Sequence, residues 1–127
     1  MLTASHLMKE NLAKVPYSAT ALDAAKLMRE RRIGSVFVEQ NGQIVGIVTE
    51  SDLVRDVVGM SLAANHILVK NIMSSPVIGL DERSPITEAA DLMERNGTRH
   101  LAVLKADRIV GVLSVRDLLH PVSVDEF

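Results

Sequence analysis

The chain of 127 residues contains an internal repeat, and this repeat limits its possible folds more than any other feature. When the sequence is shifted by 65 residues, Met8 aligns with Met73 and Asp52 aligns with Asp117, and no gap is needed between them. Chance similarity would not keep one register over half a chain, so the protein is a duplication. We place the first repeat at residues 1–62 and the second at residues 63–127. Further matches in the same register are Ala24-Ala25 on Ala89-Ala90, Leu27-Met28 on Leu92-Met93, Val38 on Val103 and Ile44-Val45-Gly46 on Ile109-Val110-Gly111.

Each repeat has the pattern of a helix. Apolar residues recur with helical spacing over residues 21–28 and again over residues 86–93. We expect Thr20 and Ser84 to be the N-caps of these helices, with Pro85 in the first turn of the second one. Gly97 is expected to end that second helix in the left-handed conformation.

A predicted β-hairpin and a short helix follow in each repeat. In the first repeat, Asn41-Gly42 separates two β-rich segments and is a strong hairpin signal. In the second repeat, Ala106-Asp107 stands at the turn and gives a weaker signal. Short helices near residues 51–58 and 115–119 close the repeats. The sequence therefore predicts an α/β protein of the α+β type, made of two β-α-β-β-α repeats. Since an isolated hairpin is marginal, we expect the repeats to share one core about a pseudo-twofold axis, with clefts between them.

The composition excludes several classes of function. The chain has no cysteine, which removes disulfides, thiolate nucleophiles and zinc–thiolate sites. Its formal net charge of −2 gives no general attraction to nucleic acid or to an anionic membrane. The histidines lack metal-ligand spacing, and no apolar run approaches the ~18 residues of a membrane span. We expect a cytoplasmic protein that binds no nucleic acid, membrane or metal.

The most specific local motif is a glycine, two aliphatic residues, Thr or Ser, two variable residues and Asp. It runs from Gly46 to Asp52 and is repeated from Gly111 to Asp117. A hydroxyl and a carboxylate at this spacing can bind the vicinal hydroxyls of a ribose, because Asp accepts hydrogen bonds and Thr or Ser can donate or accept them. The same residues can also form a helix capping box, and for a single repeat we favour that simpler interpretation. Capping alone does not explain the glycine.

With these motifs, the chain resembles a tandem pair of cystathionine-β-synthase (CBS) domains, a Bateman module. The resemblance covers almost the whole chain, through the Leu7-Met8 and Ile72-Met73 openings, the alanine-rich helices, the hairpins and the motif endings. It implies a regulatory module that is not an enzyme and that binds AMP, ADP, ATP or S-adenosylmethionine as a regulatory ligand, not as a catalytic cofactor. It also implies ribose contacts from Thr49 and Asp52 in one cleft and from Ser114 and Asp117 in the other.

The two repeats differ in charge at positions that often face phosphate in this family. The second repeat has Arg99-His100 before its hairpin and Arg116 before its motif aspartate, where the first has Gly34-Ser35 and Ser51. We therefore predict that Arg99, His100 and Arg116 bind phosphate and that the second cleft prefers a phosphorylated ligand. The alternative is that both arginines are solvated surface charges.

The resemblance places the adenine base near Ala13 and Lys14 in one cleft and near Ile78 and Gly79 in the other. Lys14 departs from the small hydroxyl residue often found there. The implied partners are a second copy of the chain, giving a homodimer, and a separate effector protein. The alternative function is a structural dimerisation or protein-interaction module with one or both clefts empty. An enzyme such as a nucleotide hydrolase is disfavoured, because the sequence shows no nucleophile–base pair, metal cluster or P-loop.

Overall fold

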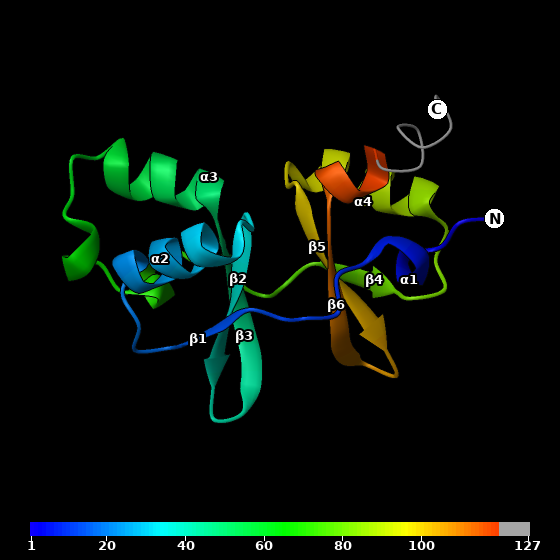
Figure 1. Ribbon diagram of the computed structural model, residues 1–127, viewed down its shortest axis with the longest axis horizontal. Helices are drawn as coiled ribbons and strands as arrows, with labels where there is room; N and C mark the ends of the chain where they lie inside the picture. The colour runs from blue at the N-terminus through cyan, green and yellow to red at the C-terminus, as the bar shows by residue number, and fades with distance from the viewer. Residues whose placement is uncertain (120–127) are drawn as a thin grey trace. The chain divides into compact units, whose positions relative to one another are not determined.

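The computed structural model describes residues 1–119, which form two compact units (Figure 1). The first-repeat unit comprises Ala13–Val77, and the second-repeat unit combines Met1–Leu12 with the chain from Ile78 onward. Each unit contains one three-stranded sheet with helices, so the predicted α+β class and its two repeats are confirmed. The repeat boundary between residues 62 and 63 stays a prediction about the sequence, because the compact units divide the chain at other points.

In the first-repeat unit, the sheet order is β1-β2-β3, with β1 parallel to β2 and β2 antiparallel to β3. The elements are β1 (Lys14–Pro16), α2 (Ala21–Arg31), β2 (Ser35–Gln40), β3 (Gln43–Thr49), α3 (Glu50–Leu53), the π-helical turn η1 (Val54–Val58) and the 3-10 turns η2 (Ala64–His66) and η3 (Val69–Asn71). The closing helix predicted near residues 51–58 is thus confirmed as α3 continued by η1, and Gly59 is its C-cap.

The second-repeat unit has the same topology, with sheet order β4-β5-β6. Its elements are α1 (Ala4–Leu7), β4 (Gly79–Asp81), α4 (Ile86–Asn96), β5 (His100–Lys105), β6 (Arg108–Ser114) and a final helical segment at residues 115–119. No helix among the described residues is long and apolar enough to cross a membrane.

The helix caps follow the sequence with one exception. The Thr20 hydroxyl accepts a hydrogen bond from the Asp23 N–H at 3.2 Å, as expected for the N-cap of α2. Ser84 was expected to cap α4 with Pro85 in its first turn, and both predictions are wrong, because Pro85 is itself the N-cap, with an extended ψ of 150°. The Ser84 carbonyl accepts the Ala4 N–H at 2.8 Å, and this pairing keeps the chain extended one residue further. Gly97 ends α4 at φ 61°, as predicted.

The hairpin turns have positive φ angles at both central residues. Asn41 and Gly42 lie at φ 54° and 78°, which confirms the turn predicted from the Asn-Gly pair. Ala106 and Asp107 adopt the same conformation, at φ 51° and 64°, although neither is a residue that favours it as glycine does. Arg32 likewise ends α2 in the left-handed region at φ 56°, where the second repeat has Gly97.

Each unit has its own aliphatic core. Ala24 of α2 and Ala89 of α4 are fully buried, so the small side chains let each helix approach its sheet closely. Met28 and Met93 are buried beside them. The first core includes Val36, Val38, Val48, Val57 and Val69, and the second includes Leu80, Leu101, Val103 and Leu113.

Each repeat begins with a leading segment, residues 1–12 in the first repeat and 63–77 in the second, and each leading segment belongs to the unit built by the other repeat. Met8 opens the first repeat, but it packs against the core of the second-repeat unit; Met73 opens the second repeat and packs against the first. Lys9 pairs with Val112 of β6 through two backbone hydrogen bonds of 2.9 and 3.0 Å. Ser74 pairs in the same way with Ile47 of β3, at 2.9 and 3.1 Å. In Figure 1 the dark-blue segment with α1 accordingly runs with the yellow and orange strands.

Candidate functional site

In the first-repeat unit, the end of β3 and the start of α3 bring Thr49 and Asp52 together. The Thr49 N–H donates to Asp52 Oδ2 at 2.8 Å, and the Thr49 hydroxyl donates to the same oxygen at 3.1 Å. In return, the Asp52 N–H donates to Thr49 Oγ1 at 3.3 Å. Asp52 is only 4% exposed. The capping box foreseen from the sequence is therefore formed.

The second-repeat unit repeats this geometry at Ser114 and Asp117. The Ser114 N–H and hydroxyl donate to Asp117 Oδ2 at 2.8 and 3.0 Å, and the Asp117 N–H donates to Ser114 Oγ at 3.3 Å. Asp117 is 9% exposed. In both units, the capping hydrogen bonds use Oδ2 of the carboxylate, whereas Oδ1 faces a cation. The ribose role of the four residues stays a prediction.

The two Oδ1 atoms face cations of different origin. In the first-repeat unit, Arg55 Nη2 donates to Asp52 Oδ1 at 2.9 Å, and the same guanidinium also donates to Asp56 at 3.2 Å. The hydrogen bond to Asp56 and the negative charges of Asp56 and Asp52 raise the pKa of Arg55. In the second-repeat unit, Lys9 Nζ lies 3.7 Å from Asp117 Oδ1, and its side chain is 69% exposed. This cation comes from the leading segment, far from Asp117 in the sequence.

The residues predicted to bind phosphate have backbones that adjoin Ser114 and Asp117. The Arg99 carbonyl accepts the Val115 N–H at 2.9 Å, and His100 is the register partner of Ser114. Arg116 directly precedes Asp117 in the helical segment. The structure thus brings these predicted residues to one end of the β5–β6 hairpin.

The residues predicted to contact the base lie on the other side of the central strand in each sheet. The carbonyls of Ala13 and Ile78 accept the N–H groups of Phe37 and Ala102, both at 2.9 Å. Lys14 pairs with Glu39 through an ion pair of 3.4 Å. Gly79 lies so close to β5 that a Cβ atom there would come within 2.8 Å of the Ala102 carbonyl oxygen. Their contact with a base stays a prediction.

The motif glycines have a packing role that the sequence did not reveal. A Cβ atom on Gly111 would collide with the side chain of Met8, and a Cβ atom on Gly46 would collide with Met73. Both glycines are buried. The glycine of the motif therefore makes room for the methionine of the leading segment.

Lys9 is the site residue that sequence reasoning missed. By sequence it belongs to the first repeat, whereas the structure places its ammonium beside the aspartate of the second. The repeat itself held a signal, because Lys9 directly follows the recurring Met8, and the equivalent of Lys9 after Met73 is the uncharged Ser74.

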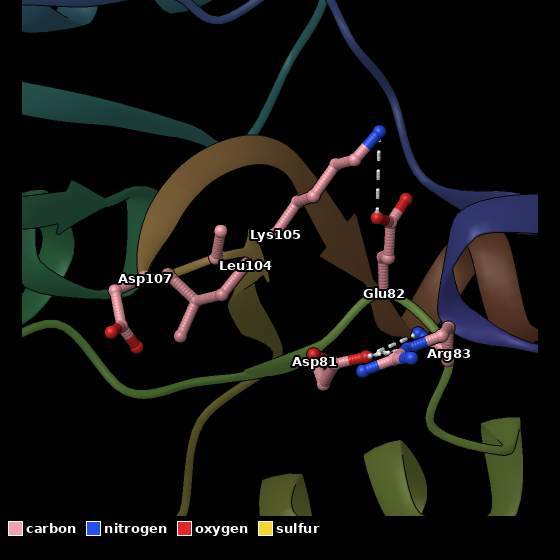
Figure 2. A pocket seen from close by; sticks show the side chains of 7 residues that line it. Asp81, Glu82, Arg83, Leu104, Lys105 and Asp107 are labelled. Carbon is pink, nitrogen blue, oxygen red and sulfur yellow. Dashed lines mark hydrogen bonds and ion pairs between the residues drawn. The ribbon is translucent and has the colours of Figure 1, made fainter.

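A surface depression of about 550 Å³ lies at the other end of the second sheet (Figure 2). Four of its five charged side chains form ion pairs: Arg83 Nε lies 3.1 Å from Asp81 Oδ1, and Lys105 Nζ lies 4.0 Å from Glu82 Oε2; Asp107 is the fifth. The hydrogen bonds from Arg83 lower the pKa of Asp81. None of the predicted ligand-binding residues lines this depression. Residues 1–119 also contain no cluster of three or more His, Asp or Glu residues suited to a metal ion.

Known proteins match the chain over most of its length. The CBS domain family model matches residues 4–59 and 69–123. A structure of a protein with CBS domains from Burkholderia ambifaria shares 30% sequence identity and a TM-score of 0.92, covering 99% of this chain and 97% of that one. A CBS domain protein from Pyrobaculum aerophilum, solved in complex with AMP, shares 30% identity and a TM-score of 0.80, covering 92% and 90% of the two chains.

Among curated sequences, a 17.7 kDa protein from Acidianus ambivalens is 35% identical over 103 residues, which is 80% of this chain and 61% of the relative. A relative from Methanopyrus kandleri is 36% identical over 52% of its own length. The chain therefore spans about half to three fifths of the length of these curated relatives. The two family matches, together with the repeated sheet topology and motif geometry, show that this chain belongs to the CBS domain family.

Proposed function

We propose that the protein is a regulatory module that senses an adenosyl ligand, such as an adenine nucleotide or S-adenosylmethionine, and transmits the bound state to a partner. The ligand would bind at Thr49 and Asp52 in one unit and at Ser114 and Asp117 in the other. One observation carries this proposal: both units hold a buried carboxylate with Oδ2 fixed by capping and Oδ1 turned toward an exposed cation.

The capping box prepares the aspartate for a ribose. Three hydrogen bonds fix each Asp–hydroxyl pair before a ligand arrives, so binding costs little side-chain entropy. Asp117 Oδ1 can accept a hydrogen bond from one ribose hydroxyl. Ser114 Oγ has two lone pairs and uses one for the Asp117 N–H, so it can accept from the neighbouring hydroxyl. The same holds for Asp52 and Thr49. Capping and ribose binding are thus compatible uses of the same residues.

The second-repeat unit has the charges for a phosphorylated ligand. Arg99, His100 and Arg116 adjoin Ser114 and Asp117, and the equivalent positions of the first-repeat unit are Gly34, Ser35 and Ser51. Arginine binds phosphate through paired, charge-assisted hydrogen bonds. The AMP bound to the Pyrobaculum aerophilum relative supports a nucleotide as the ligand. The base would lie beside Ala13 and Lys14 or beside Ile78 and Gly79.

Regulation would follow from a shift between two packing states of the protein. A ligand shifts such an equilibrium only by its difference in affinity for the two states. We propose that the readers of the shift are a second copy of the chain, in a homodimer, and a separate effector protein. In this role the ligand is regulatory and no reaction takes place on it.

Thermal unfolding in the presence of adenine nucleotides, S-adenosylmethionine and guanine nucleotides tests the proposal. A ligand at ~100 times its Kd adds ~2.7 kcal/mol of stability, which raises Tm by several degrees. We expect Asp117→Asn to remove most of the adenine-specific rise, because the amide carries a donor that replaces one of the two carboxylate acceptors. Asp91→Asn, at an exposed position of α4, is the matched control and should respond like the wild type. Equal responses of Asp117→Asn and wild type would contradict the proposed site.

A protein-interaction module is the second candidate, and an apolar surface on the first-repeat unit favours it. Val54, Val58, Met60 and Leu62 are exposed, with Val58 at 70%. Their burial in an interface would remove this apolar surface from water. Light scattering after gel filtration tests the idea: Val58→Asp should lower the oligomeric state, and Lys26→Asp on α2 should leave it unchanged. A wild-type monomer that binds no adenosyl ligand would contradict both candidate functions.

A further inference from the structure

Four basic residues adjoin the segment from Ser114 to Asp117 in the second-repeat unit, and all four are replaced by small neutral residues in the first-repeat unit. Lys9, Arg99, His100 and Arg116 correspond, through the shift of 65 residues, to Ser74, Gly34, Ser35 and Ser51. The difference in charge between the two repeats is therefore concentrated at one site, and one of the four basic residues, Lys9, comes from the exchanged leading segment. We propose that Lys9 is a specificity-determining residue of the second-repeat site that binds the phosphate of an anionic ligand. This inference rests on the proposed function for the adenosyl part of the ligand.

The backbone of Lys9 is held firmly at the site. Its N–H donates to the Val112 carbonyl at 2.9 Å, and its carbonyl accepts the Val112 N–H at 3.0 Å. Met8 packs in the space left by Gly111, one residue before Val112. The origin of the Lys9 side chain is thus fixed two residues from Ser114, at the edge of β6.

The ammonium of Lys9 remains available to a ligand. Its distance of 3.7 Å from Asp117 Oδ1 is an ion-pair distance that is longer than a hydrogen bond, and the side chain is 69% exposed. An exposed ion pair of this kind contributes little to stability. Arg55 in the first-repeat unit differs, because Asp52 and Asp56 both hold its guanidinium through hydrogen bonds of 2.9 to 3.2 Å. Lys9 can therefore turn to a phosphate oxygen, whereas Arg55 is held by two carboxylates.

The charges at the site match a phosphate. Lys9, Arg99 and Arg116 carry three positive charges against the one negative charge of Asp117. A phosphate monoester carries ~1.5 to 2 negative charges at neutral pH and balances the surplus. Without Lys9, the two positive charges of Arg99 and Arg116 would fall short of the ~2.5 to 3 negative charges that Asp117 and the phosphate carry together.

The inference is tested with Lys9→Met, which keeps the aliphatic stem and removes the charge. Lys105→Met is the matched control, because Lys105 is also 69% exposed, lies in the same unit and pairs with a carboxylate, Glu82, at 4.0 Å. Binding of AMP, adenosine and inorganic pyrophosphate to the full chain is measured by calorimetry. We expect Lys9→Met to weaken AMP and pyrophosphate about tenfold, the size of one charge-assisted hydrogen bond, and to leave adenosine unchanged. Lys105→Met should leave all three affinities unchanged.

The three ligands separate the two proposals. One outcome is that the wild type binds pyrophosphate but neither AMP nor adenosine. If Lys9→Met then weakens the binding of pyrophosphate, the adenosyl function is wrong and the role of Lys9 stands. If AMP binding depends on Asp117 but is equal in Lys9→Met and Lys105→Met, the adenosyl function stands and the role of Lys9 is overturned. Equal losses for AMP and adenosine in Lys9→Met also overturn it.

Discussion

The side chain of Met8 fills the space that a Cβ atom on Gly111 would need, and Met73 has the same relationship to Gly46. Each pair joins the leading segment of one repeat to the hairpin of the other. The contact places Lys9 beside β6 and Ser74 beside β3, because each follows its methionine directly. The conformation of the site thus depends on two glycines that are not themselves predicted to bind the ligand.

Replacing either glycine with alanine should destabilise the protein. The new methyl group of Gly111→Ala would meet Met8 and come within 3.1 Å of the Lys9 carbonyl oxygen, so part of the overpacking falls on rigid backbone. We expect a loss of ~1 to 3 kcal/mol in the free energy of unfolding, measured in urea. Adding Met8→Ala should recover part of the loss, since it removes the flexible half of the collision. No recovery in the double variant would show that the backbone contact dominates.

The C-cap residue of each long helix offers a comparison between repeats. Arg32 and Gly97 adopt the same left-handed conformation, at φ 56° and 61°, but only glycine does so without strain. We expect Arg32→Gly to stabilise the protein by ~1 kcal/mol and Gly97→Ala to destabilise it by a similar amount. Thermal or urea unfolding measures both. Arg29→Gly, inside α2, is the control and should destabilise the helix.

The two hairpin turns give a second comparison of this kind. Ala106 and Asp107 adopt the positive φ angles that Asn41 and Gly42 adopt in the first repeat. Transferring the first turn to the second, as Ala106→Asn with Asp107→Gly, should therefore stabilise the protein by ~1 kcal/mol without affecting ligand binding. A destabilised double variant would mean that the turn residues make favourable contacts that outweigh their backbone strain.

The capping and ligand-binding roles of the motif can be separated by substitution. Thr49→Ala and Ser114→Ala each remove a hydroxyl that accepts an N–H at the start of a helix, so each should cost ~1 kcal/mol of stability without any ligand. Thr49→Ser and Ser114→Thr keep the hydroxyl and should retain both stability and ligand affinity. An alanine variant that loses stability but binds the ligand normally would leave only the capping role.

Folding stability in acid should depend on Asp23 and Asp81. Hydrogen bonds from the Thr20 backbone and hydroxyl lower the pKa of Asp23, and those from the Arg83 backbone and side chain lower that of Asp81, both below the usual value of 3.8. Because the folded pKa lies below the unfolded one, the stabilisation is present above about pH 3.8 and is lost as the pH falls through the folded pKa. In urea unfolding from pH 6 to pH 2, Asp23→Asn and Asp81→Asn should show a weaker pH dependence than Asp91→Asn.

The repeat and its local signals predicted the fold well. The constant register, the helical spacing of residues 21–28 and the Asn41-Gly42 turn all depend on neighbours in the sequence, and the structure confirms them. The N-cap of α4 was misplaced by one residue, because the pairing between Ala4 and Ser84 involves distant parts of the chain. Lys9 was missed for the same reason. A repeat shows which residues are equivalent, but it does not show which repeat supplies a given segment to a given core.

The exchanged leading segments make the two repeats interdependent. A fragment of residues 63–127 would lack Met8 and Lys9, and a fragment of residues 1–62 would lack Met73 and Ser74. Each fragment would carry the missing piece of the other, and each would leave the outer edge of its hairpin unpaired where Val112 or Ile47 now binds a leading segment. In the present chain both exchanges take place within one molecule, so that one sheet edge is completed by the segment with Lys9 and the other by the segment with Ser74.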